Sequence, residues 1–369
     1  MRVLMVSKAC IAGAYQLKLE AIAKLGVDLT VVVPPYWKDD AGREAPLERV
    51  HTEGYRFLVE EMAFNGHFHY HYYPRLHRVF REARPDILHM DEEPYNLATL
   101  QGFWLAKRVG ARPLFFTWQN LYRRYPPPFS WMERYAYRNA AGAITGNQDA
   151  VDVLRQKGYG GPTWVIPQFG VDPDLFRPDP SIRRNERPFT VGFCGRLRAR
   201  KGEHLLVDAV AALGGDARLE VLGWGEEAAK LQQHAKQVGI GERFRIHRAM
   251  PSIEVPRFYN SIDVLAAPSL TLPSWKEQFG RVLTEAMACG VPVVGSDSGE
   301  IARVIGDAGL LFPEGDVPAL TECLRRLRDQ PELRASCAER GLQRVHALFT
   351  QKSIAEQTVQ AYREVLGRP

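Results

Sequence analysis

The first 35 residues alternate short apolar runs with one amphipathic stretch. Val3 to Ser7 and Leu29 to Val33 are apolar runs of strand length, and Gln16 to Leu25 carries apolar residues at helical spacing. Ala12 and Gly13 interrupt the chain between the first strand and the helix. A strand, a glycine turn, a helix and a second strand make the βαβ unit of a parallel sheet covered by helices, so the pattern predicts an α/β fold.

The pattern continues through the first half of the chain and restarts after Pro188. Apolar runs at 85–90, 114–118 and 143–145 predict further strands of the first sheet. A second series follows, with strands at 190–194, 219–222 and 264–267 and helices at 204–213 and 226–238. Two series indicate two domains. This is expected for a chain of 369 residues, because a single hydrophobic core usually stops growing below that length.

A turn-rich stretch separates the two series. Residues 166–178 are dense in Pro, Gly and Asp, and a polar, arginine-rich stretch follows up to Pro188. We therefore predict domains at 1–178 and 179–349. Residues 350–366 form an amphipathic helix that could simply cap the second domain.

Composition narrows the classes of function. With 45% hydrophobic and 25% charged residues, the chain is an ordinary globular protein. Its five cysteines are scattered and never spaced as C-x-x-C, which argues against a disulfide framework or a zinc site and favours the cytosol. No apolar run approaches the roughly 20 residues of a spanning helix, so we expect at most peripheral contact with the inner face of a membrane. The net charge of +5 comes without a recognisable nucleic-acid-binding pattern, so we expect no nucleic acid as a partner.

Two segments of the second series carry candidate chemistry. Glu277 and Glu285 lie eight residues apart, roughly 12 Å along a helix, which exceeds the roughly 5 to 9.5 Å of glycoside hydrolase pairs. A nucleotide sugar, with hydroxyls at both ends and phosphates between, suits this spacing, since helix-start amides offer an anion site. Arg196 and Lys201, between a strand and a helix, could hold its diphosphate. The alternative interpretation is two solvated glutamates and a solvated basic turn.

These motifs resemble glycosyltransferase family 4. The resemblance rests on Gly195-Arg196-Leu197 with Lys201-Gly202, and on Glu277 and Glu285 in E-x7-E, and it is strong over residues 164–320. It implies the GT-B fold, with two Rossmann-like domains facing each other across a donor-binding cleft. The N-terminal domain would bind the acceptor, the C-terminal domain the donor, and the helix at 350–369 would cross back onto the first domain.

The resemblance also implies an activity and site residues. The activity is retaining, metal-independent hexosyl transfer from a nucleoside diphosphate sugar, with no cofactor and no metal, to an unidentified hydroxyl, lipid-linked or of a cell-surface glycan precursor. Glu277, Arg196 and Lys201 would be catalytic, the last two on the diphosphate and Glu277 on the sugar. Donor contacts would come from Gly13, Met250, Gln278, Phe279, Gly280, Arg281 and Glu285, with Glu285 on the ribose.

Three N-terminal positions depart from the family's pattern or extend it. Gln119 stands where many members have a histidine aimed at the donor sugar. An amide can bind a hydroxyl but cannot act as an acid or base, which agrees with the mechanism proposed for the family, in which the leaving phosphate assists the acceptor. Ala14 follows Gly13 where a second glycine is common. Glu92, in the stretch 89–94 after a strand, is a further candidate for sugar or acceptor contact, or merely part of a turn.

Three further signals have two interpretations each. Residues 122–138 interleave arginines with aromatic residues, as at a lipid interface or in a partly buried helix beside a proline loop. His67, His69 and His71 alternate as on a strand, where they could mimic a metal site, and we favour an ordinary strand. Asp172-Pro173-Asp174 mimics a metal-binding D-x-D but lies in a turn-rich linker.

Functions of other classes share this architecture. A sugar-nucleotide epimerase would convert the donor without an acceptor, and a non-catalytic protein would only bind it. The E-x7-E spacing together with Arg196 and Lys201 favours transfer.

Overall fold

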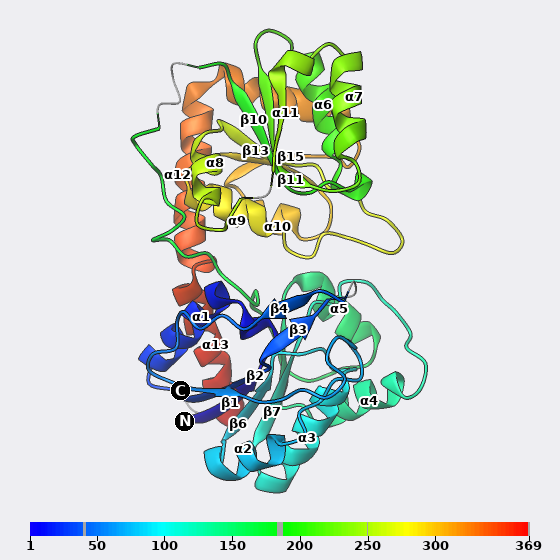
Figure 1. Cartoon of the computed structure of the whole chain (residues 1–369), viewed down its shortest axis with the longest axis vertical. Helices are drawn as coiled ribbons and strands as arrows, with labels where there is room; N and C mark the ends of the chain where they lie inside the picture. The colour runs from blue at the N-terminus through cyan, green and yellow to red at the C-terminus, as the bar shows by residue number, and fades with distance from the viewer. Residues whose placement is uncertain (40–41, 183–186, 249, 368–369) are drawn as a thin grey trace. The chain divides into compact units, whose positions relative to one another are not determined.

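The structure, a computed structural model, describes residues 1–39, 42–182, 187–248 and 250–367, which form two compact units (Figure 1). The first unit comprises Met1–Gly170 and Gln351–Pro369, and the second comprises Val171–Thr350. The predicted boundary at residue 178 therefore moves to Gly170. The reason is local pairing, because Val171 donates its N–H to the Phe349 carbonyl at 2.8 Å and bridges to Thr350 within the second unit.

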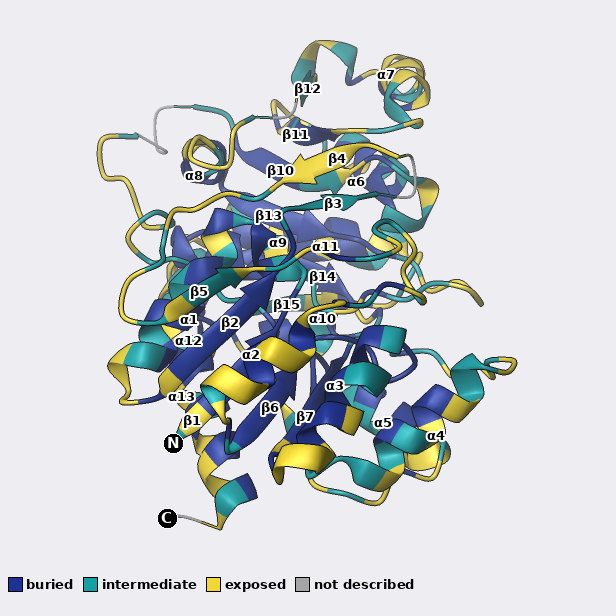
Figure 2. Cartoon of the chain, turned by 60° about the horizontal axis from the view of Figure 1, so that its bottom comes forward, coloured by how far each residue is buried: buried dark blue, intermediate teal, exposed yellow. Residues whose placement is uncertain are grey.

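A parallel seven-stranded sheet forms the centre of the first unit, in the order β5-β2-β1-β6-β7-β8-β9. Figure 2 shows β2, β6 and β7 buried over nearly their whole length, as expected for a sheet covered on both faces. The strands are β1 (Arg2–Val6), β2 (Asp28–Val33), β5 (Arg56–Val59), β6 (Ile87–Met90), β7 (Arg112–Thr117), β8 (Gly142–Thr145) and β9 (Thr163–Val165), with a separate hairpin of β3 (Tyr36–Lys38) and β4 (Glu44–Pro46).

Helices cover this sheet, and one of them comes from the far end of the chain. They are α1 (Gly13–Lys24), α2 (Leu76–Ala83), α3 (Leu97–Val109), α4 (Phe129–Asn139), α5 (Gln148–Gln156) and α13 (Gln351–Leu366). Helix α13 packs against α1 and buries Val359 and Tyr362 in the same apolar cluster as Val3 and Ile22. Its Tyr362 hydroxyl lies 2.7 Å from His89 Nδ1 at β6. The C-terminal helix therefore completes the first unit.

The second unit repeats the plan with six parallel strands in the order β12-β11-β10-β13-β14-β15. The strands are β10 (Thr190–Arg196), β11 (Arg218–Trp224), β12 (Phe244–His247), β13 (Val264–Ala267), β14 (Val293–Ser296) and β15 (Gly309–Phe312). The helices are α6 (Glu203–Leu213), α7 (Ala228–Gln237), α8 (Val255–Asn260), α9 (Arg281–Ala288), α10 (Ile301–Ile305), α11 (Val317–Asp329) and α12 (Pro331–Leu348).

One predicted strand is wrong. Residues 66–71 form turns, in which His71 donates its N–H to the His67 carbonyl at 3.2 Å. Phe64 and Gly66 have φ of 54° and 93°, which bend the chain where an extended strand was predicted. His71 is buried while His67 is exposed, so the histidines do not share one face.

Candidate functional site

The loop after β10 brings two basic side chains to the carboxyl edge of the second sheet. Arg196 ends β10, and its guanidinium lies 4.6 Å from the ring centre of Trp224 at the end of β11. Lys201 closes a short 3-10 helix (Ala199–Lys201) just before α6. Strand-to-helix turns of this kind are where open α/β sheets bind ligands.

Gly202 fixes the approach of this loop to the segment after β13. It has φ of 70°, and a Cβ on it would lie 1.9 Å from the Pro268 carbonyl oxygen. No side chain fits such a gap, so the backbone after Lys201 can lie directly against residue 268 only because this position is glycine.

Lys201 and Glu277, one from each of the two candidate segments, form an ion pair. Lys201 Nζ donates to Glu277 Oε2 at 2.6 Å, and the Ser269 hydroxyl donates to the same oxygen at 3.0 Å. Glu277 is only 9% exposed, and the Trp275 ring centre lies 5.0 Å from the Lys201 ammonium. The structure therefore brings together the lysine predicted for the diphosphate and the carboxylate predicted for the sugar.

Glu285, the second carboxylate of the motif, lies inside α9 with both oxygens held. Tyr259 donates its hydroxyl to Oε2 at 2.7 Å, and Arg281 Nε lies 3.0 Å from Oε1. Burial raises the pKa of Glu285, and Arg281 and the Tyr259 hydroxyl offset part of that rise. A carboxylate fixed in this way can accept hydrogen bonds from a diol in one defined orientation.

The start of α9 has the features of an anion site. Gly280 precedes the helix with φ of 77° and has no side chain to cap it, so capping is left to other groups. Gln278 and Arg281 are exposed beside this helix start. Phe279 instead turns its ring toward Phe349, 5.7 Å between centres, so the Phe279 side chain serves packing. Met250 is partly buried against the core that includes Leu222 and Leu265.

Gly13 begins α1 in the first unit, and a carboxylate of the same chain lies on it. Its N–H donates to Glu48 Oε2 at 2.6 Å, and the Gln16 side chain amide donates to the Glu48 carbonyl at 2.6 Å. A Cβ on Gly13 would lie 2.5 Å from a methyl group of Val50. The predicted phosphate-facing amide thus has an anionic partner already, which shows that this helix start accepts a negative group.

Gln119 follows β7 and is held by a buried cation. Lys157 Nζ donates to Gln119 Oε1 at 3.1 Å and also lies 2.5 Å from Glu133 Oε1 on α4. Gln119 Nε2 is buried with no hydrogen-bond partner among the described residues. This amide therefore retains a donor, which a sugar or acceptor oxygen could satisfy once the side chain turns outward.

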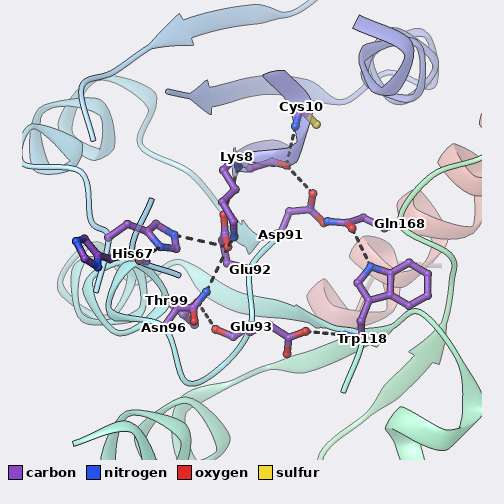
Figure 3. Close-up of polar contacts among 12 residues, drawn as sticks. Lys8, Cys10, His67, Asp91, Glu92, Glu93, Asn96, Thr99, Trp118 and Gln168 are labelled. Atoms are coloured by element: carbon purple, nitrogen blue, oxygen red, sulfur yellow. Dashed lines mark hydrogen bonds and ion pairs between the residues drawn. The ribbon is translucent and has the colours of Figure 1, made fainter. Parts of the chain in front are cut away.

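Glu92 is enclosed by polar side chains, and Figure 3 shows it beside Lys8 and Asn96. Lys8 forms an ion pair with its carboxylate, His71 Nε2 lies 3.6 Å away, and Asn96 donates to it at 3.4 Å. Burial alone would raise the pKa of Glu92, but Lys8 and His71 outweigh it and lower the pKa to about 2. The Glu92 side chain is fully buried, so it cannot contact a ligand directly. Its ion-pair partner Lys8, whose side chain is 16% exposed, could make that contact.

Comparison with known proteins accounts for both units. Residues 15–167 match the family described as "Glycosyl transferase 4-like domain", and residues 178–344 match "Glycosyl transferases group 1". The phosphatidyl-myo-inositol mannosyltransferase of Mycobacterium leprae is 28% identical over 98% of this chain and 92% of its own length. The chain belongs to the group 1 glycosyl transferases.

Two further similarities qualify this family assignment. The 2-deoxystreptamine glucosyltransferase of Streptomyces kanamyceticus is 31% identical over 57% of this chain, and the match spans only 58% of that relative's length. The Anabaena protein HepE in complex with UDP is 20% identical, covers 99% of this chain and all of its own, and has a TM-score of 0.73. At that identity the likeness concerns the fold, and it confirms the predicted GT-B class with two Rossmann-like domains.

The sequence of this group 1 glycosyl transferase predicted the charged candidate residues of the second unit. It did not predict the residues that contact them. It missed Ser269, which shares Glu277 with Lys201, and Trp275, which lies beside Lys201. It also named Glu92 but not Glu93, the next residue, whose carboxylate faces β7. The run Asp91-Glu92-Glu93-Pro94 directly after a buried strand was the available signal.

The part of the chain that the structure describes holds neither a metal-binding cluster nor a membrane-spanning helix. No group of three or more His, Cys, Asp or Glu side chains there is arranged to hold a metal ion. Asp172 instead accepts the Asp174 N–H at 2.9 Å, as in an Asx turn. No helix of these residues combines the length and apolar character needed to cross a membrane.

Proposed function

We propose that this group 1 glycosyl transferase moves a sugar, with retention of configuration and without a metal ion, from a nucleoside diphosphate sugar to an acceptor hydroxyl. The observation that carries the proposal is the contact between Lys201 and Glu277, 2.6 Å apart, with Glu277 just before the start of α9, where the N-cap residue Gly280 offers no side chain. One small region thereby offers a cation, a carboxylate and helix-start amides, which are the partners of a phosphate and a sugar hydroxyl.

Each group has one role in this proposal. Arg196 and Lys201 bind the diphosphate and stabilise the charge that grows as it leaves. Glu277 accepts hydrogen bonds from the transferred sugar, and Glu285 accepts them from the ribose hydroxyls. Backbone amides of 278–281 hold a phosphate, and Met250 lies along the nucleobase. The amide of Gly13 faces a phosphate that takes the place of the Glu48 carboxylate. Gln119 donates to the sugar or the acceptor.

Retention follows if the leaving group assists the acceptor. The bond from sugar C1 to the phosphate oxygen breaks, the acceptor oxygen bonds to C1 on the same face, and the acceptor proton passes to the departing phosphate oxygen. No protein base is needed in this sequence. Gln119, an amide at the position of the family's histidine, is consistent with it.

The donor in this proposal is a nucleoside diphosphate sugar. Fixed cations and amides neutralise its diphosphate and so replace the metal ion that would otherwise do this. The complex of HepE with UDP supports a uridine nucleotide as the first to test. The five cysteines are free thiols, which supports a reducing compartment such as the cytosol.

A membrane-bound acceptor is supported by the outer face of α4 and the loop before it. Trp131 and Tyr122 are 59% and 43% exposed. Four arginines of the same stretch are also exposed, namely Arg123, Arg124, Arg134 and Arg138. Exposed aromatic and cationic side chains together suit an anionic lipid surface. We therefore propose a lipid-linked acceptor at the inner face of a membrane.

Incubation with a panel of UDP, GDP and ADP sugars, followed by product analysis, tests the proposal. Transfer to water or to added acceptors, with the anomeric configuration of the donor kept, is the expected result. An epimerised donor without transfer would instead indicate a sugar-nucleotide epimerase. Binding without any product would indicate a non-catalytic sugar-nucleotide binder.

A further inference from the structure

Glu93 and Glu92 are neighbours in sequence with opposite surroundings (Figure 3). Glu92 meets a cation, Lys8, whereas Glu93 meets only uncharged donors. Glu93 Oε1 accepts the backbone N–H of Trp118 at 2.8 Å, and Oε2 accepts the Thr117 hydroxyl at 2.6 Å. Both donors lie where β7 ends, so Glu93 connects the end of β6 to the end of its neighbour.

The hydrogen bonds continue from Glu93 to Gln119. Thr117 Oγ1 accepts the backbone N–H of Gln119 at 3.1 Å while its own hydroxyl donates to Glu93. The Trp118 indole donates to Gln168 Oε1 at 2.9 Å. This bond fixes Trp118, which lies between Thr117 and Gln119 in the sequence. The backbone of Gln119 is therefore placed by a short relay that ends on the Glu93 carboxylate.

Burial and polar contacts act on the pKa of Glu93 in opposite directions. Burial raises the pKa of Glu93 to about 7, against the opposing effect of the Thr117 and Trp118 hydrogen bonds. Lys8 also lowers this pKa and Glu92 raises it. The hydroxyls of Tyr95, Tyr125 and Tyr137 also sense the Glu93 charge. Among the described residues, no ion pair reaches Glu93 itself.

The two charge states order the relay differently. The ionised carboxylate accepts from both Thr117 and Trp118, and a hydroxyl that donates becomes a better acceptor for the Gln119 N–H. In the protonated acid the proton lies on Oε2, because the backbone N–H at Oε1 can only donate, whereas the Thr117 hydroxyl at Oε2 can turn and accept. Thr117 Oγ1 then accepts from both Glu93 and Gln119, and its own proton loses this partner. The ionised form therefore holds Gln119 more firmly.

We infer that Glu93 is a positioning residue that sets the place of Gln119 through Thr117 and Trp118, and that proton uptake by Glu93 loosens that placement. This inference rests on the proposed function, since it matters for transfer only if Gln119 contacts the sugar or the acceptor. Its consequence is a transfer rate that rises with pH as Glu93 ionises.

The test compares the pH profile of transfer for the wild type and Glu93→Gln. A glutamine accepts the Trp118 N–H and donates to Thr117, so it reproduces the protonated acid at every pH. We expect kcat of the wild type to rise through about pH 7, while the variant stays at the wild type's acidic limit. The difference at about pH 8.5 is expected to be about 10- to 100-fold, the loss typical of a misplaced contact, with the donor dissociation constant unchanged.

Two matched substitutions make the result specific. Glu20→Gln removes a carboxylate in the same unit that accepts the Glu53 N–H at 3.1 Å, and it should keep the wild-type profile. Burial also raises the pKa of Glu203 to about 7, so Glu203→Gln should keep the pH transition as well. A transition that persists in Glu93→Gln, or disappears in Glu203→Gln, overturns the inference.

A readout independent of activity separates this inference from the proposed function. Trp118 fluorescence, isolated as the difference between each protein and its Trp118→Phe version, should change through about pH 7 in the wild type and not in Glu93→Gln. If transfer is absent with every donor but this change is present, the proposed function fails while the positioning by Glu93 stands. A Trp118 signal that is flat with pH in the wild type would show that Glu93 takes up no proton in this range, and it overturns the inference.

Discussion

Lys201 donates a hydrogen bond to Glu277 across 2.6 Å, so the cation proposed for the diphosphate and the carboxylate proposed for the sugar hold each other in place. Two residues that share a direct contact do not contribute independently. The effects of replacing each of them should therefore overlap in the double variant, and their sum should exceed the effect of replacing both.

Glu277→Ala should abolish most transfer and leave the fold intact. The carboxylate orients the sugar and buries little apolar surface, so we expect kcat/KM to fall by at least about 100-fold and Tm to move by less than about 4 °C. Assays of transfer and thermal unfolding check this. Glu332→Ala, an exposed glutamate of α12, is the control and should behave as wild type. Near-normal turnover of Glu277→Ala would contradict the assignment.

Lys201→Ala should weaken donor binding and slow departure of the diphosphate. Loss of one transition-state donor costs on the order of 3 kcal/mol, roughly 100-fold in rate. Lys201→Arg keeps the positive charge but places it on a planar guanidinium instead of a compact ammonium, so it should recover only part of the loss. Donor titrations and single-turnover rates measure both effects. If neither affinity nor rate changed in Lys201→Ala, the lysine would be a structural partner of Glu277 only.

Nucleotide affinity should depend on pH through Glu285. Burial raises its pKa, so the carboxylate takes up a proton at a higher pH than an ordinary glutamate and then loses part of its capacity to accept ribose hydroxyls. The dissociation constant of a nucleoside diphosphate should therefore rise as pH falls toward that pKa. Calorimetric titrations at several pH values check this. In Glu285→Gln the affinity should be lower and the pH dependence lost, and a variant that keeps the dependence argues against the ribose contact.

Removal of metal ions should leave transfer essentially unchanged. Arg196, Lys201 and the start of α9 supply the positive charge that a divalent ion would otherwise supply to the diphosphate. Rates measured in EDTA and after addition of Mg²⁺ or Mn²⁺ check this expectation. A strict requirement for either ion would contradict the metal-independent mechanism.

Anionic vesicles should bind the protein through α4 and the loop before it. Each basic residue near the surface contributes roughly 1 kcal/mol, and added salt should weaken binding. Replacement of Arg134 and Arg138 by Gln should reduce sedimentation with vesicles while donor binding is kept. Arg325 and Arg326, exposed on α11, provide a control pair of equal charge. If the wild type ignores anionic vesicles at low salt, a soluble acceptor replaces the lipid-linked one.

Strand positions could be predicted from the sequence because the parallel sheets are buried on both faces and leave continuous apolar runs. The run at 264–267 coincides with β13, and the predicted helix at 204–213 begins one residue after α6 does. The strand predicted around His67 failed because alternation of polar and aromatic residues does not reveal the bend at Phe64 and Gly66.

Charged residues of the candidate site could be found from motif spacing, but their supports could not. Ser269 and Glu277 are eight residues apart, and only the folded loop shows that they share a hydrogen bond. Glu92 and Glu93 look alike in sequence, and which of them meets Lys8 depends on the direction in which each side chain leaves the strand end. Burial by distant elements is the information that a single sequence lacks.

The contribution of α13 to the first unit has a consequence for biosynthesis. Residues 1–170 lack the helix that supplies Val359 and Tyr362 to their core until α13 has been made. During translation the second unit, Val171–Thr350, is complete in sequence before the first one is. We expect the order of folding on the ribosome to run against the order of synthesis, with the first unit exposing apolar surface until α13 has been made.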